Sequence, residues 1–159
     1  MLPTESKEID GINFVTTMLP PLKAYPLAPR VAQIAIPVLQ KMATLGLNAK
    51  EVAGLKDMDV IKFLPMIEPL LEALGKKENE DLPQKLLAST SADIADDNGN
   101  VTRIALLTPE AINRVFAGRG KLMTMIKAMW FVAGVNFGDF FAGGRKSAPS
   151  KEPQGTASA

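Results

Sequence analysis

The segment from Thr108 to Gly144 constrains the fold more than any other part of the chain. It contains the single Trp, most of the Phe residues and the densest run of Met. If residues 121–135 form a helix, apolar side chains cover most of its circumference and leave only a narrow polar edge. Such a helix lies at the centre of a core or under a binding partner. The apolar run is too short, and Lys127 too central, for a membrane span.

Local signals divide this segment into two helices. Thr108, Pro109 and Glu110 form a helix start, with a capping hydroxyl, a proline at the first helical position and an acid in the first turn. Gly118 and Gly120 predict a sharp turn before the second helix, because glycine tolerates backbone conformations that other residues avoid. We expect Asn136 to cap or turn the chain before the last aromatic residues.

The first half of the chain contains one predicted strand and two predicted helices. Residues 1–11 are polar, and we expect them to be flexible. Residues 12–18 are rich in β-branched side chains and predict a strand. The proline-containing residues 22–29 predict an extended connection. Helical periodicity follows from Arg30 to Gly46, and again over residues 57–74.

A β-hairpin is predicted in the second half. Asn98 and Gly99 separate two short runs, at residues 91–95 and 101–106, and Asn-Gly is the strongest local hairpin signal. The fold class is therefore predicted as mainly α with a small antiparallel β-sheet (α+β), a compact helical domain with a β-hairpin. The predicted organisation is a flexible N-terminus (1–11), a single helical domain (12–141) and a disordered tail (142–159).

Composition excludes several kinds of chemistry. The chain has no Cys and no His, which removes thiolate metal sites, the commonest zinc ligand and the usual general base. With 18 basic and 17 acidic residues, there is no electrostatic case for nucleic acid. Asp96 and Asp97 adjoin Asn-Gly and are best explained by the turn. We predict no catalytic residues, no metal and no cofactor, although a small hydrolase or transferase using Asp96, Asp97 or Arg119 stays as the weakest hypothesis.

The apolar side chains after residue 121 have two interpretations, core or binding surface. Met side chains repack easily around different partners, and three Phe residues within five positions are hard to bury completely. We predict that Phe116 and Trp130 hold the fold, and that Arg119 pairs with Asp139. The predicted partner-binding residues are Met123, Met125, Met129, Phe137, Phe140 and Phe141.

Two short motifs at the ends of the Thr108–Gly144 segment carry a family resemblance. Phe116, Ala117, Gly118 and Arg119 form a Phe-x-Gly-Arg element, and residues 136–141 form an Asn-Phe-x-Asp-Phe-Phe element that includes Asn136 and Asp139. The segment Leu86–Thr90 and the predicted hairpin precede these two motifs. Together they make the half of the chain from Leu86 to Phe141 resemble the tail assembly chaperones of long-tailed bacteriophages. The chain departs from that pattern at Val115, where many members have His.

The resemblance implies a small non-enzymatic chaperone of the host cytoplasm that binds the tape-measure protein and keeps it soluble until tail-tube subunits assemble. In many relatives a frameshifted longer form recruits the tube protein. Neither nucleic acid nor membrane is an expected partner, and homo-oligomerisation is compatible with several copies lining one client. The acidic, polar N-terminus is unlike a signal peptide and agrees with a cytosolic protein. The alternative is a minor structural tail protein retained in the virion.

Overall fold

The computed structural model describes residues 2–44, 46 and 68–147, with side chains described as far as residue 138. These residues fall into two compact units. One unit comprises residues 1–20 and 86–159, and the other comprises residues 21–85. Each unit is described by itself. Most of the helix predicted over residues 57–74 lies outside the described residues, although residues 68–74 are helical.

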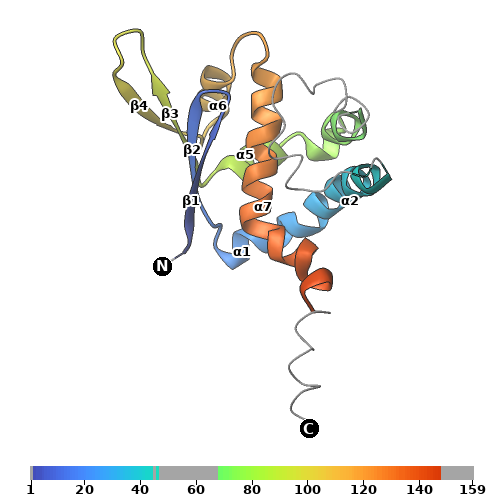
Figure 1. Cartoon of the computed structure of the whole chain (residues 1–159). Coiled ribbons are helices and arrows are strands. Elements are labelled where there is room, and N and C mark those ends of the chain that lie inside the picture. The colour runs from blue at the N-terminus through green and yellow to red at the C-terminus, as the bar shows by residue number, and fades with distance from the viewer. Residues whose placement is uncertain (1, 45, 47–67, 148–159) are drawn as a thin grey trace. The chain divides into compact units, whose positions relative to one another are not determined.

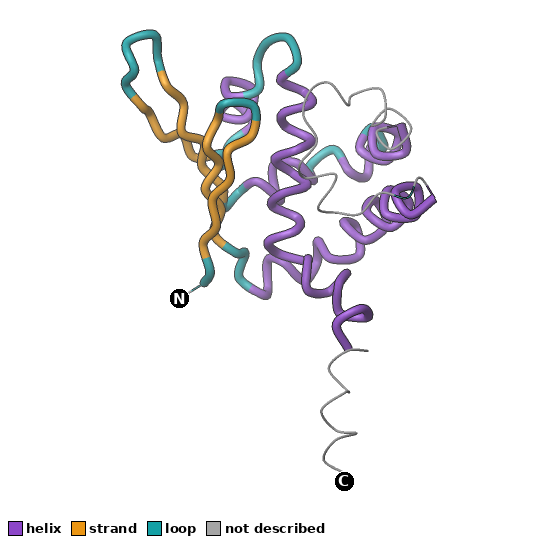
Figure 2. The backbone as a smooth tube through the Cα atoms, viewed as in Figure 1, coloured by secondary structure: helices purple, strands orange, loops and turns teal. Residues whose placement is uncertain are grey.

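The first unit is built on a four-stranded antiparallel sheet with strand order β1-β2-β3-β4. Its strands are two hairpins, drawn in orange in Figure 2: β1 (Thr4–Ile9) with β2 (Ile12–Thr17), and β3 (Thr90–Ala95) with β4 (Val101–Ala105). The central β2–β3 pairing places Phe14 opposite Ala92. Both side chains are buried, together with Ile12, Thr16 and Thr90. One face of the sheet is therefore a core face.

The predicted fold class, mainly α with a small antiparallel sheet (α+β) and one β-hairpin, is wrong, because the chain has a four-stranded antiparallel sheet built from two hairpins and is mixed α+β rather than mainly α. The prediction treated residues 1–11 as flexible and therefore missed β1. Asp10 and Gly11 connect β1 to β2 with positive φ angles of 51° and 83°, which is the geometry of a two-residue hairpin turn. Asp-Gly is a recognised signal for that turn, so the sequence did contain the evidence for β1. The extent of the predicted domain (12–141) and of the predicted tail (142–159) stays a prediction.

The hairpin predicted in the second half of the chain is confirmed as β3 and β4. Its loop is a turn closed by a hydrogen bond from Gly99 N to Asp96 O (3.0 Å), with Gly99 at φ 83°. This arrangement is typical of three-residue hairpin loops, in which a glycine with positive φ follows the turn. The Asp96 carboxylate accepts hydrogen bonds from the backbone N–H groups of Asn98 and Asn100, both at 2.8 Å. Asp96 thus has the turn-forming role that the sequence favoured over catalysis.

Two helices complete the first unit. Helix α6 (Pro109–Val115) begins as predicted, with Thr108 Oγ1 accepting a hydrogen bond from Ala111 N at 3.2 Å. Helix α7 (Lys121–Ser147) then follows the turn at Gly118 and Gly120, where φ is 108° and 75°. It contacts β1 and β2 and lies beside their hairpin in Figure 1. The buried residues of α7 within the described side chains are Thr124, Ile126, Ala128, Met129, Val132 and Phe137.

The second unit contains α1 (Pro21–Ala24), the 3-10 turn η1 (Tyr25–Leu27), α2 (Ala28–Thr44), the 3-10 turn η3 (Lys77–Asn79) and most of α5 (Leu82–Leu87). The predicted helix from Arg30 is confirmed as α2, with Pro37 inside it on the exposed side. The predicted extended connection over residues 22–29 is wrong. A proline in the first turn of a helix costs no hydrogen bond, so Pro21 and Pro29 are compatible with helix starts.

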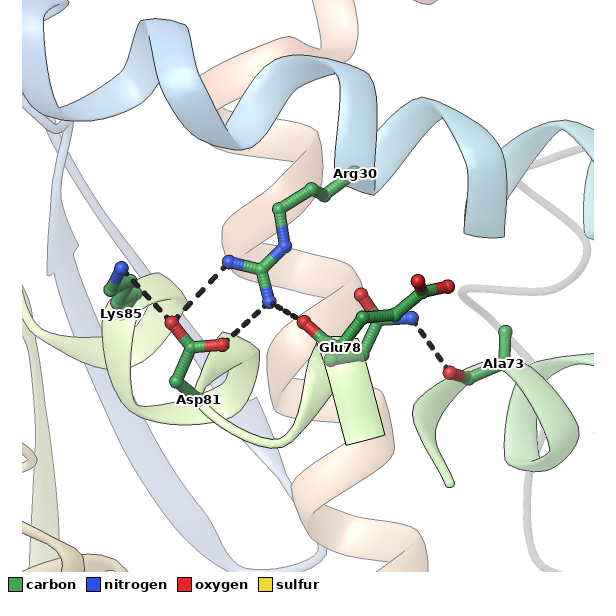
Figure 3. Close-up of polar contacts among 6 residues, drawn as sticks. Arg30, Ala73, Glu78, Asp81 and Lys85 are labelled. Carbon is green, nitrogen blue, oxygen red and sulfur yellow. Dashed lines mark hydrogen bonds and ion pairs between the residues drawn. The ribbon is translucent and has the colours of Figure 1, made fainter. Parts of the chain in front are cut away.

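A polar cluster ties α2 to the second half of this unit (Figure 3). Arg30 donates hydrogen bonds to Asp81 Oδ1 (2.7 Å) and to the carbonyl oxygen of Glu78 (2.9 Å). Lys85 pairs with the other carboxylate oxygen of Asp81 at 2.9 Å. The hydrogen bond from Arg30, followed by that from Lys85, holds the pKa of Asp81 well below its ordinary range. Arg30 thereby fixes the segment between η3 and α5 against α2.

Candidate interaction surfaces

Helix α7 makes polar contacts at two places, the β1–β2 hairpin turn and the segment just after β2. At the hairpin turn, Thr124 Oγ1 donates to Asp10 Oδ2 at 2.8 Å, and Lys127 Nζ lies 3.2 Å from Asp10 Oδ1. Burial raises the pKa of Asp10, but the hydrogen bonds from Thr124 and Lys127 outweigh it and the pKa is lowered overall. Asp10 therefore remains ionised and anchors the first turns of α7.

The second contact involves Asn136. The sequence predicted that Asn136 caps or turns the chain, but it does not end the helix. Helix α7 continues to Ser147, and Asn136 is one of its interior residues. Its Oδ1 accepts a hydrogen bond from Leu19 N at 2.7 Å, while its Nδ2 donates to Val132 O at 2.9 Å. The side chain therefore satisfies a backbone N–H group just beyond the end of β2. Only tertiary structure reveals this role, since Leu19 is 117 residues away.

The predicted pair between Arg119 and Asp139 does not fit the backbone. Arg119 precedes the first turn of α7, and Asp139 follows 18 residues after Lys121 in the same helix. At 1.5 Å per residue, Lys121 and Asp139 are about 27 Å apart along the helix axis, and Arg119 lies before Lys121. The prediction is wrong because it assumed a break in the helix at Asn136. Phe116, by contrast, stacks on Phe14 with ring centroids 5.9 Å apart, which is a fold-holding contact.

The predicted partner-binding residues are divided between buried and exposed positions. Met129 and Phe137 are buried, whereas Met123 and Met125 are partly exposed. The side chains of Phe140 and Phe141 lie outside the described residues, and Trp130 is partly exposed. Leu122, which was not predicted, is 58% exposed and lies one helical turn before Met125. Among the described side chains of α7, the large apolar residue most open to a partner is therefore Leu122, in the first turn.

A larger exposed apolar surface lies on the second unit. The elements α1, η1 and α2 follow one another without a loop, and their apolar residues alternate between two faces. Buried residues form one face, while exposed apolar residues recur at helical spacing on the other. The exposed residues of this face, termed the outer stripe, are Leu22, Tyr25, Pro26, Pro29, Ile36 and Pro37.

The outer stripe exposes three large apolar side chains, two of them almost completely. Leu22 is 90% exposed, Tyr25 is 79% exposed and Ile36 is 46% exposed. The stripe spans residues 22–37, or about 22 Å at the rise of an α-helix. Gln33 and Gln40 interrupt it without adding charge. Exposed apolar surface of this extent makes the outer stripe the candidate interaction surface of the second unit.

The sequence did not predict the outer stripe because residues 22–29 were expected to be extended. An extended segment has no helical face, so Leu22 and Tyr25 could not be related to Ile36. The i, i+3, i+7 spacing of Leu22, Tyr25 and Pro29 was the available signal.

Over the described ranges, no group of three or more acidic side chains is placed to hold a metal ion. None of the helices within those ranges has the length and apolar character needed to cross a membrane. What the described structure offers is an α+β protein with exposed apolar helical faces.

Comparison with known proteins identifies the family. The family model described as phage tail assembly chaperone protein, TAC, matches residues 10–149. No curated protein and no solved structure matches the chain. Since the match covers most of the sequence, the chain belongs to the phage tail assembly chaperone family, and the resemblance carried by the two motifs is confirmed. The protein is thus a bacteriophage tail-assembly chaperone, and its family favours protein partners and a non-enzymatic role.

Proposed function

We propose that this chaperone binds the tape-measure protein in the host cytoplasm and keeps it soluble during tail assembly, without catalysis. A long helical client with apolar stripes would aggregate alone, and a chaperone must cover those stripes reversibly. The observation that carries the proposal is the outer stripe, which presents Leu22, Tyr25 and Ile36 to solvent at helical spacing. An apolar helical partner can pack its own ridges against such a face.

The chemistry of the stripe fits a contact driven by apolar burial. Burial stabilises a complex by roughly 25 cal/mol per Å² of apolar surface. Because the net charge of the chain is +1, long-range electrostatic steering adds little. The first turns of α7, with Leu122, Met123 and Met125, provide a second and smaller apolar surface. Phe140 and Phe141 belong to the same proposal at the far end of α7, whereas Met129 and Phe137 are buried and pack in the core. Recruitment of tail-tube protein by a frameshifted form, and homo-oligomerisation, are further parts of the proposal.

Co-expression with the tape-measure protein tests this proposal. Wild-type chaperone should keep the client in the soluble fraction, and a variant with Leu22→Ser, Tyr25→Ser and Ile36→Ser should not. The matched control is Leu71→Ser, which removes one exposed Leu that belongs to neither proposed surface and leaves the stripe intact. Loss of solubility with the triple variant alone assigns the client to the outer stripe. If wild-type chaperone gives no gain in client solubility, the proposed function is wrong.

A further inference from the structure

The two edges of the sheet differ in their protection against pairing with another strand. Edge strand β1 contains Glu5, Lys7 and Glu8, and charged side chains are a usual means of preventing edge-to-edge association. Edge strand β4 has the sequence Val-Thr-Arg-Ile-Ala and contains a single charged residue, Arg103. That charge is already engaged, since Arg103 Nε and Nη2 donate to the two carboxylate oxygens of Asp93 at 2.7 and 2.9 Å. Strand β4 is therefore an unprotected edge.

The hydrogen-bond pattern identifies which backbone groups of β4 point outward. Leu106 N donates to Thr90 O (2.9 Å), and Asp96 N donates to Asn100 O (2.8 Å). Hydrogen-bonded pairs alternate along an antiparallel ladder, so Thr102 and Ile104 also direct their backbone groups toward β3. Val101, Arg103 and Ala105 direct theirs away from the sheet, where the described part of the chain supplies no partner strand.

We propose that this edge pairs with the β4 edge of a second copy of the chain, in antiparallel orientation, to form a continuous eight-stranded sheet. The proposed register places Arg103 of one copy opposite Ala105 of the other. This register keeps the two Arg103 residues from facing each other directly, which would place like charges in contact. It also brings the exposed Val101 (65%) beside the exposed Leu107 of the second copy.

A second copy is the occupant that the residues of β4 favour. A two-fold axis pairs the strand with itself, so each end of the interface receives one Val101 and one Leu107. The same axis places the two Ile104 residues directly opposite each other, in a pair without hydrogen bonds across the new edge. In such pairs the Cα atoms are about 4.5 Å apart. This dimer specifies the homo-oligomerisation named in the proposed function, but it does not depend on client binding and concerns a different element from the outer stripe.

Cysteine cross-linking tests the register directly, because the chain has no Cys of its own. Under mild oxidation, I104C should form a covalent dimer, since the expected Cα separation lies within the range that a disulfide spans. The matched control is T102C, whose two copies would be more than about 13 Å apart in this register. Circular dichroism of both reduced variants checks that each is folded. Absence of a covalent dimer with folded I104C overturns the proposed pairing.

A proline substitution tests the edge without cysteine. Ala105→Pro removes an N–H group that points away from β3, so it should leave the β3–β4 ladder intact and prevent pairing between copies. Ala105→Ser keeps the N–H group and is the control. By sedimentation over a wide concentration range, wild type and A105S should dimerise and folded A105P should remain monomeric. A monomeric wild type, or an A105P variant that dimerises as wild type does, would contradict the proposal.

Discussion

Helix α7 and the helical segment 21–44 both carry many apolar residues, yet the structure uses them differently. Helix α7 is apolar over most of its circumference, and residues from several of its faces are buried, including Ile126, Met129 and Val132. Segment 21–44 buries one stripe, from Leu27 to Met42, and leaves Leu22 and Tyr25 exposed on the other side. A high apolar content thus gives a core helix in one case and a helical segment with an exposed apolar face in the other. The arrangement of apolar residues around the helix, not their number, separates the two.

The largest expected effect concerns the core against which α7 packs. Phe14 is completely buried and stacks on Phe116, so Phe14→Ala removes a large side chain from a closed site. We expect the free energy of unfolding to fall by about 3–5 kcal/mol. Urea denaturation followed by Trp130 fluorescence measures it. The control is Tyr25→Ala, an aromatic truncation on the outer stripe, which should cost less than about 0.5 kcal/mol. Equal losses in the two variants would remove the distinction between core and stripe.

The next effect separates binding from stability on the outer stripe. Leu22→Ala should weaken client binding by about 1.5–3 kcal/mol if the complex buries this side chain, because that is the usual value of a fully buried Leu. Thermal melting should be unchanged, since Leu22 is 90% exposed. Affinity for a purified client fragment can be measured by calorimetry. Unchanged affinity, alongside weaker binding by a Leu122→Ser variant, would transfer the client site to α7.

How much of the fold and of the candidate surfaces could be predicted from the sequence depends on how many positions separate the interacting residues along the chain. Thr108, Gly118 and the Asn98-Gly99 hairpin were predicted correctly, because caps and turns depend on residues a few positions apart. The Asp10-Gly11 turn carried an equally local signal that was not used. The contacts of Asp10 with Thr124, and of Leu19 with Asn136, join residues more than 100 positions apart. No periodicity within one element reports such pairs, and the role of Asn136 was therefore misassigned.

An intermediate effect is expected at Asn136. Asn136→Ala removes the acceptor for Leu19 N, which is partly buried and would lose its 2.7 Å hydrogen bond. An unsatisfied backbone N–H group costs about 1–3 kcal/mol, so the free energy of unfolding should fall by that amount. The matched control is Asn113→Ala, which truncates an exposed Asn on α6. Chemical denaturation of both variants gives the difference. A loss at Asn136 no larger than that at Asn113 would mean that water replaces the acceptor.

The smallest effect concerns the charges on the other face of the sheet, and its sign follows from the pKa of Asp93. Hydrogen bonds from Arg103 and then Asn13 lower this pKa from 3.8 to about 2. A carboxyl with a lowered pKa in the folded state stabilises the fold above its unfolded pKa, and this contribution is lost as the pH falls from about 4 toward 2. The free energy of unfolding should decline more steeply over that interval in wild type than in Asp93→Asn. Because Arg103 is largely exposed, solvent screening keeps the difference small. Parallel pH slopes in the two proteins would show that this exposed pair adds nothing to stability.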